Sequence, residues 1–218
     1  VLVGKADLHI LKQSGGDVNH SRLTLDLRPL NHNSITRPKI NLPNYESLIP
    51  VFKNKNISTA DLCSMYWSIH VTESTQHLSN FFYDHHVYSF CSLPQGWINS
   101  CFVGQSATEA AYGQDAMLEF LTFKGWKPGT DLWPWYEIRD AILIYMDDLC
   151  LYSDNTVPGH VALHGRLIEF LFWATKRAGF RIGANKFSPF VTSFKFLGHW
   201  FDGTRGSTAI PPARLEAI

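Results

Sequence analysis

The pair Asp147-Asp148, between two apolar runs, constrains the fold of this chain more than any other feature. Residues 141–145 and 149–152 are rich in Ile, Leu and Tyr, which predicts two strands joined by a tight hairpin with both aspartates at its tip. Adjacent carboxylates are costly there, because like charges repel and apolar neighbours lower the local dielectric. Mg²⁺ would offset that cost by accepting carboxylate oxygens as ligands. The alternative is an ordinary turn, in which Asp is common.

A third carboxylate, Asp61, ends another predicted strand at residues 57–62. Carboxylates from neighbouring strands can hold two metal ions about 3.5–4 Å apart, the spacing used for in-line phosphoryl transfer. Asp61 is therefore the candidate third member of a metal site with Asp147 and Asp148.

The remaining pattern predicts an α+β fold. Its second part has the order strand, helix, hairpin, helix, strand, which is typical of a ferredoxin-like antiparallel sheet with helices on one face. The expected elements are a half-buried strand at 22–27, a long connection at 31–43, a short helix at 44–52 capped by Asn44, an aromatic hairpin at 78–92, one long or two short helices at 98–121, an amphipathic helix at 159–179 ended by Gly179, and a final strand or hairpin at 194–201.

Composition excludes several classes of protein. With 45% hydrophobic and 17% charged residues in 218, the chain is neither disordered nor a polar coiled coil. Lys plus Arg balance Asp plus Glu at 19 each, so any basic groove must be local. The cysteines form no CxxC pair, and we expect reduced, buried thiols at Cys63, Cys91, Cys101 and Cys150. No apolar run reaches the 18 or more residues of a membrane span, so we expect a soluble domain.

The terminal residues favour excision from a longer chain. The sequence opens on Val1 without Met, and residues 214–218 begin a helix-like pattern that stops. We therefore expect a domain of a polyprotein.

Five motifs carry a resemblance to a known family. Tyr145-Met146-Asp147-Asp148 resembles the YMDD signature of reverse transcriptases, and residues 93–97, LPQGW, resemble a segment of the retroviral enzymes. Further similarities are residues 22–31 to a fingers strand, 58–62 with Tyr66 to the first palm motif, and 196–199 to the primer grip. In their order the motifs resemble a reverse transcriptase of the retroviral or LTR-retrotransposon type, an RNA-directed DNA polymerase and nucleotidyltransferase.

The resemblance implies the fingers and palm of a right-hand polymerase. Fingers would span residues 1–36 and 68–99, and the palm 37–67 and 100–218, without the thumb, connection and RNase H regions. The Trp-rich residues 125–140 would be an insertion in the palm. Implied partners are a primed RNA or DNA template, dNTPs, and the thumb, connection, RNase H and integrase regions of the polyprotein. The implied location is the cytoplasm, within virus-like particles or virions, and no membrane is implied.

The resemblance also assigns the chemistry. Asp61, Asp147 and Asp148 would be the catalytic carboxylates, and with the Leu62 carbonyl they would bind two Mg²⁺ ions, with Mn²⁺ as a substitute. Lys186 would protonate the pyrophosphate.

Other positions would bind the substrates. Arg22 would hold the triphosphate, Tyr66 would exclude the ribose 2′-hydroxyl, Gln95 would touch the sugar, and Gly96 would allow close backbone approach. The primer grip would be Phe196, Leu197, Gly198 and His199.

Each assignment has a plainer alternative. Tyr66 would otherwise be a core aromatic, Arg22 a surface ion-pair residue, Gln95 a turn residue, Lys186 a solvated lysine, and residues 196–199 a core strand. The family usually has a basic residue shortly before the arginine, whereas the nearest lysine here is Lys12. For the whole chain, the alternatives are a catalytically silent scaffold or domesticated element and an RNA-templated RNA polymerase. Tyr66 favours deoxynucleotides, and the complete set of aspartates favours an active enzyme.

Overall fold

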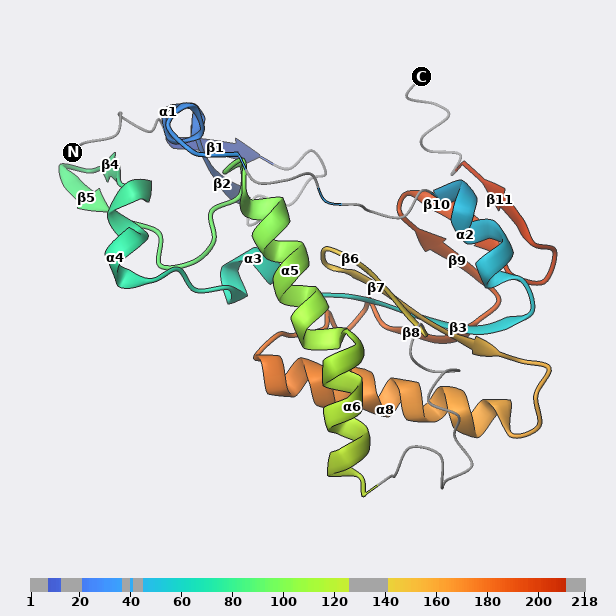
Figure 1. The fold of residues 1–218 in the computed structure, drawn as a ribbon. Helices are drawn as coiled ribbons and strands as arrows, with labels where there is room; N and C mark the ends of the chain where they lie inside the picture. Colours follow the sequence, from blue (N-terminus) through green and yellow to red (C-terminus); the bar gives the residue numbers. More distant parts are fainter. Residues whose placement is uncertain (1–7, 13–20, 37–39, 41–44, 126–140, 211–218) are drawn as a thin grey trace. The chain divides into compact units, whose positions relative to one another are not determined.

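The computed structural model describes residues 8–12, 21–36, 40, 45–125 and 141–210 (Figure 1). The chain divides into two compact units: Val1–Ile40 with Tyr66–Gly104, and Asn41–Met65 with Gln105–Ile218. The expected Asn44 cap, most of the Trp-rich segment and the helix-like start at 214–218 lie outside the described residues.

The first unit contains two antiparallel hairpins and short helices. Strand β1 (Leu8–Lys12) pairs with β2 (Ser21–Leu25), and β4 (Phe81–Tyr83) pairs with β5 (His86–Tyr88). The predicted aromatic hairpin is confirmed, and its two-residue turn has positive φ at Asp84 and His85, as type I′ turns require. Its short helices are α1 (Arg28–His32), α4 (Glu73–Gln76) and the 3₁₀ turn η1 (His77–Ser79), while α3 (Met65–Ser68) lies at the junction with the second unit.

Helix α1 occupies part of the segment expected to be a long connection. Pro29 lies in its first turn, where a fixed φ and a missing N–H favour helix initiation. The predicted strand at 22–27 is correspondingly shorter and ends at Leu25.

The second unit is built on a four-stranded antiparallel sheet with the strand order β6-β7-β3-β8. The strands are β3 (Lys55–Asp61), β6 (Ile142–Tyr145), β7 (Asp148–Asp154) and β8 (Ser188–Val191). The predicted α+β class and the strand, helix, hairpin, helix, strand order are confirmed. The prediction for the last strand is wrong, because the fourth strand of this sheet is β8 and not residues 194–201. β8 contains Pro189 and lies at a sheet edge, where proline is tolerated.

Residues 193–209 form a separate three-stranded sheet with the order β11-β10-β9. Its strands are β9 (Ser193–Phe196), β10 (His199–Asp202) and β11 (Ser207–Ala209). The predicted hairpin at 194–201 is therefore present, but it belongs to this sheet.

The long helices end where glycine interrupts them. Between α5 (Ser100–Tyr112) and α6 (Gln114–Phe123), a Cβ on Gly113 would meet the Glu109 carbonyl oxygen at 2.4 Å. Of the two expectations for residues 98–121, the structure has two helices, and Gly113 separates them. Helix α8 (His160–Ala178) ends, as predicted, at Gly179 with φ 74°, a left-handed cap that glycine adopts without side-chain clash.

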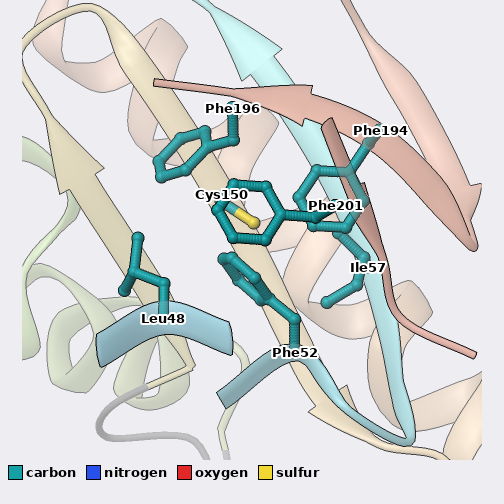
Figure 2. Close-up of a cluster of buried hydrophobic side chains, with 7 residues drawn as sticks. All are labelled: Leu48, Phe52, Ile57, Cys150, Phe194, Phe196 and Phe201. Carbon is teal, nitrogen blue, oxygen red and sulfur yellow. The ribbon is translucent and has the colours of Figure 1, made fainter. Parts of the chain in front are cut away.

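Four phenylalanines form the centre of the core on one face of the four-stranded sheet (Figure 2). Phe52, at the end of α2 (Tyr45–Phe52), packs edge-to-face on Phe194 and Phe201, with ring centroids 5.1 and 5.0 Å apart. Leu48, Ile57, Cys150 and Phe196 complete this aromatic cluster. The opposite face of the sheet contacts α8, so the sheet is covered on both sides.

The expectation that all four cysteines are buried is wrong for three of them. Cys150 is buried in the aromatic cluster, whereas Cys63, Cys91 and Cys101 are exposed free thiols. Cys63 follows the end of β3 and Cys101 lies in the first turn of α5, so both lie near the ends of elements and outside the core. Among the described residues, no helix has the length and apolar character needed to cross a membrane.

Candidate active site

Strand register brings the predicted carboxylates together. Asp61 and Asp148 are directly opposite each other at the ends of β3 and β7, and opposite residues of an antiparallel pair share one face, with Cβ atoms about 4.5–5.5 Å apart. The Leu62 backbone N–H donates to the Asp147 carbonyl at 2.8 Å. This bond holds Asp147 at the end of β3, so Asp61, Asp147 and Asp148 form one acidic cluster.

The Asp147 position depends on a tight turn. Tyr145 pairs with Asp148, so Met146 and Asp147 are the only residues of the loop. Met146 has φ 59°, and Asp147 does not have positive φ, the pattern of a type II′ turn, which favours glycine at its first central position. Methionine is strained in this conformation.

Gln105 contacts both sides of this turn and was missed by the sequence analysis. Its Nε2 donates to the Ile144 carbonyl at 3.0 Å, and its Oε1 accepts from the Met146 N–H at 2.7 Å. The signal that could have found it is a glutamine among the apolar positions of a helix, because a buried amide needs partners.

Lys186 and its loop contact Asp61 of the acidic cluster through two hydrogen bonds. Its Nζ donates to Asp61 Oδ2 at 2.7 Å, and the Gly183 N–H donates to the Asp61 carbonyl at 3.2 Å. A Cβ on Gly183 would come within 3.3 Å of the Lys186 side chain, so glycine leaves room for the lysine stem. Lys186 is therefore an exposed lysine that is paired with Asp61, and its role toward the pyrophosphate stays a prediction.

Burial and mutual repulsion disfavour the ionised aspartates. Burial, then the charges of Asp147 and Asp61, raises the pKa of Asp148 to about 6. Burial is also the main cause of the raised pKa of Asp147. The hydrogen bond to Asp61 raises the pKa of Lys186, which keeps that lysine charged.

A cavity of about 540 Å³ joins the acidic cluster to the predicted primer grip. It contains Lys195, a second cation that the sequence analysis missed, whose charge acts on Asp148. The lining residues come from β3, β7, the Lys186 loop and the β9–β10 turn: Thr59, Ala60, Asp61, Asp148, Leu149, Asn185, Lys186, Lys195, Phe196, Leu197 and Gly198.

The predicted primer grip is a turn and its flanking strand residues. Leu197 and Gly198 both have positive φ, at 49° and 77°, and join β9 to β10. His199 pairs with Phe196, whose ring belongs to the aromatic cluster. The core-strand alternative thus describes Phe196, while a primer contact by these residues stays a prediction.

The other predicted substrate residues lie in the first unit. Arg22 lies in β2 opposite Leu11, and its side chain is outside the described residues. The half-buried Tyr66 donates from its hydroxyl to Cys101 Sγ at 3.6 Å. Gln95 and Gly96 are exposed, and Gly96 has φ 92°, which glycine adopts freely. Their roles stay predictions.

The donor chemistry of the acidic cluster fits a hard cation. Within the described residues, no three His, Cys, Asp or Glu side chains are arranged so that they could hold a metal ion as they stand, and one Asp61 oxygen is occupied by Lys186. Carboxylate oxygens are nevertheless the ligands Mg²⁺ prefers, and burial, together with the neighbouring carboxylates, raises the pKa of both Asp147 and Asp148.

Comparison with known proteins places this geometry in a family. Residues 18–201 match the family described as reverse transcriptase (RNA-dependent DNA polymerase). The retrovirus-related Pol polyprotein from transposon gypsy of Drosophila melanogaster is 25% identical over 200 residues, which are 91% of this chain and 16% of that protein.

Solved structures share the fold. The foamy viral protease-reverse transcriptase in complex with double-stranded DNA has a TM-score of 0.68 and 20% identity over 100% of this chain and 33% of that chain. The same protein with an RNA/DNA hybrid has a TM-score of 0.66 and 19% identity, covering 98% and 24%. This chain therefore spans less than half of these relatives and has their fingers and palm architecture. By its matched residues, its acidic cluster and its fold, the chain belongs to the reverse transcriptase family of the retroviral and LTR-retrotransposon type.

Proposed function

We propose that this chain is the fingers and palm portion of an RNA-directed DNA polymerase that adds dNTPs to a primer 3′-hydroxyl. The observation that carries the proposal is the register of β3 and β7, which sets Asp61 opposite Asp148 beside Asp147 and Lys186. A cluster of three carboxylates on strand ends is what two-metal nucleotidyl transfer needs.

Asp61, Asp147, Asp148 and the Leu62 carbonyl would hold the metal ions. When bound there, Mg²⁺, or Mn²⁺ in its place, would supply Lewis acidity for nucleotidyl transfer. The Asp61–Asp148 pair fixes the donor atoms on one face of the sheet. Lys186 holds a proton on Nζ next to Asp61, where it can be transferred to the leaving pyrophosphate.

The first unit would select and hold the nucleotide. Arg22 would bind the triphosphate through its planar, always charged guanidinium. Tyr66 would exclude the 2′-hydroxyl by contact, and Gln95 with Gly96 would lie against the sugar. The fingers would be residues 1–36 and 68–99, and the palm 37–67 and 100–218.

The relatives support a polyprotein context. One is a transposon Pol polyprotein of which this chain matches 16%, and the foamy viral structures contain double-stranded DNA or an RNA/DNA hybrid. We propose that thumb, connection, RNase H and integrase regions of the same polyprotein complete the enzyme, which acts on primed RNA or DNA inside virus-like particles or virions in the cytoplasm.

Primer extension tests the proposal. The full-length parent protein, a DNA primer on an RNA template, dNTPs and Mg²⁺ should give extension that is lost in Asp147→Asn. Asp154→Asn is the matched control, because Asp154 lies at the opposite end of β7 and is paired with Lys55 at 3.0 Å. It should retain extension. A folded parent that extends no primer would overturn the proposal and support the catalytically silent scaffold.

A further inference from the structure

We propose that Ser58 and His164 are positioning residues that hold a β-bulge in β8 and thereby place Lys186 and Lys195 at the cavity, an inference that rests on the proposed function. Neither Ser58 nor His164 is among the residues that line the cavity. Both are buried, at 0% exposure. Polar side chains at this depth need hydrogen-bond partners, and the contacts of this pair lead to β8.

The pairing of β3 with β8 contains the bulge. Ser58 is opposite two residues of β8, Pro189 and Phe190, because the register shifts by one residue there. An extra residue of this kind interrupts the hydrogen bonds of the ladder and bends the strand. Pro189 suits such a position because it has no N–H to donate. The pairs on either side of the shift are Ile57 with Val191 and Thr59 with Ser188.

Side chains support the backbone at the bulge. Phe190 has a left-handed φ of 50°, a strained conformation for an aromatic residue. Its N–H donates to Ser58 Oγ at 3.1 Å, and its ring packs edge-to-face on His164 with ring centroids 4.8 Å apart. Ser58 and His164 therefore contact both the backbone and the side chain of the strained residue.

His164 determines the direction of these hydrogen bonds. Its Nε2 lies 2.7 Å from Ser58 Oγ, and its Nδ1 lies 3.0 Å from Ser153 Oγ. Because the Ser58 oxygen already accepts the Phe190 N–H, its hydroxyl proton is directed to Nε2, and the proton of the neutral ring is on Nδ1 and faces Ser153. Burial lowers the pKa of His164 to about 4, which keeps the ring neutral. The donors therefore run in one direction from β8 through β3 and α8 to β7.

The bulge determines which residues of the following chain reach the cavity. Val191 pairs with Ile57 and packs against the aromatic cluster. Without the bulge, the register would move by one residue and Phe190 would take that place, because side chains alternate between the faces of a strand. Lys186 precedes the bulge and Lys195 follows it, and both line the cavity beside the acidic cluster. The bulge therefore sets the spacing between these two lysines.

Ser58→Ala in the full-length parent tests the proposal, because it removes the acceptor of the Phe190 N–H. Ser153→Ala is the matched control: Ser153 is also buried, at 5% exposure, and its hydroxyl contacts the other nitrogen of the same ring. We expect Ser58→Ala to accelerate amide hydrogen exchange in the peptide containing residues 187–192 by about 10-fold or more. It should also lower the single-turnover rate of primer extension by about 10-fold, the scale of a small misplacement of reacting groups.

The control should separate this effect from a general loss of stability. Ser153→Ala should lower the melting temperature as much as Ser58→Ala does, because each variant removes one buried hydroxyl from the same histidine. It should change the exchange and the extension rate by about twofold at most. Equal acceleration of exchange in the two variants would overturn the proposal.

Two replacements of His164 test the role of the ring. In His164→Gln the amide oxygen can accept the Ser58 hydroxyl near the place of Nε2, whereas in His164→Asn the shorter amide reaches only the place of Nδ1. His164→Gln should therefore keep the single-turnover rate within about threefold of the parent's, and His164→Asn should lose about 10-fold. Equal losses in the two variants would overturn the proposal, because a ring that only fills space would not distinguish them.

Hydrogen exchange separates this inference from the proposed function, because it needs no activity. An inactive parent in which Ser58→Ala, and not Ser153→Ala, accelerates exchange at residues 187–192 would defeat the proposed function alone. An active parent in which Ser58→Ala leaves this exchange unchanged would defeat the role of Ser58 and His164.

Discussion

The Nζ of Lys186 lies 2.7 Å from Oδ2 of Asp61, so the chain itself supplies a positive charge to one of its three clustered carboxylates. The Lys186 side chain is 60% exposed and that of Asp61 26% exposed. Such pairs contribute little to stability, about 0–1 kcal/mol. The contact therefore has more consequence for charge at the site than for the fold, and any cation that binds this oxygen must share or displace it.

Replacing Lys186 should slow the reaction without unfolding the protein. We expect Lys186→Met to reduce the single-turnover rate of primer extension by about 100-fold, the scale of a lost general acid. Lys186→Arg should be similarly slow, because arginine keeps its proton. A rate near the parent's in Lys186→Arg would show that charge alone matters, and a rate near the parent's in Lys186→Met would refute both roles.

Neutralising Asp148 should stabilise the protein while abolishing extension. Asp148 is partly buried and repelled by Asp147 and Asp61, so Asp148→Asn removes an unfavourable charge. We expect the melting temperature to rise by about 2–4 °C at pH 8 in EDTA, the effect of about 1 kcal/mol in a chain of this size. Asp154→Asn is the opposite control, since hydrogen bonds from Thr156 and Lys55 lower the pKa of Asp154 to about 2. That substitution should lower the melting temperature.

The side chain of Tyr66 should determine sugar selectivity. In its proposed role Tyr66 would lie against the sugar, so we expect Tyr66→Val to raise incorporation of ribonucleotides relative to deoxynucleotides by about 10-fold or more. Tyr66→Phe keeps the ring and removes the hydroxyl that contacts Cys101, so it should keep the parent's selectivity. Steady-state kcat/KM for a matched dNTP and NTP pair measures both variants, and unaltered selectivity in Tyr66→Val would remove Tyr66 as the gate.

Buried His164 should make the fold acid-sensitive. Its ring lies between Ser58 Oγ at 2.7 Å and Ser153 Oγ at 3.0 Å, and burial lowers the pKa of His164 to about 4. An unfolded histidine titrates near about 6.5. Between these two values the unfolded state binds the proton and the folded state does not, so stability falls as pH drops from about 6.5 to 4.

Urea titrations at several pH values measure this dependence. His164→Gln should flatten the slope of stability against pH in that range, even though it lowers stability overall. His85→Gln, at an exposed turn position, should leave the slope unchanged. An equal slope in the parent and His164→Gln would show that other groups cause the acid sensitivity.

Removing the Phe52 ring should cost much of the stability of the aromatic cluster. It is 1% exposed, and its ring contacts those of Phe194, Phe196 and Phe201 (Figure 2). Its ring also contacts that of Tyr152. Phe52→Ala should lower the free energy of unfolding by about 3–5 kcal/mol, while Phe52→Leu should cost less. Because Phe196 packs on Phe52, primer-template binding should weaken in parallel. A loss below about 1 kcal/mol in urea unfolding of Phe52→Ala would contradict this packing.

The sequence predicted the features that depend on short-range pattern. Strand character at 57–62 located β3, and the apolar runs at 141–145 and 149–152 located the β6–β7 hairpin with Asp147 and Asp148 at its turn. Gly179 ended α8 as expected. These features are set by neighbouring residues, which is why a single sequence contains them.

Features set by distant partners were not predictable in the same way. β8 is short and contains Pro189, and only its pairing with β3 identifies it as the fourth strand. Gln105 is recognisable only once α5 is placed against β6, because its partners are 39 and 41 residues away. Cysteine burial likewise depends on the faces of elements that the spacing of cysteines does not specify.

The number of residues in β3 determines both the acidic cluster and the packing of the aromatic cluster. Asp61 and Ile57 lie on one face of β3, so the same residue spacing aligns a carboxylate with Asp148 and a side chain with the aromatic cluster. An inserted or deleted residue between them would turn one of the two to the α8 side. Descendants of this sequence can therefore change length in their connections, but these two strands must be inherited without gaps.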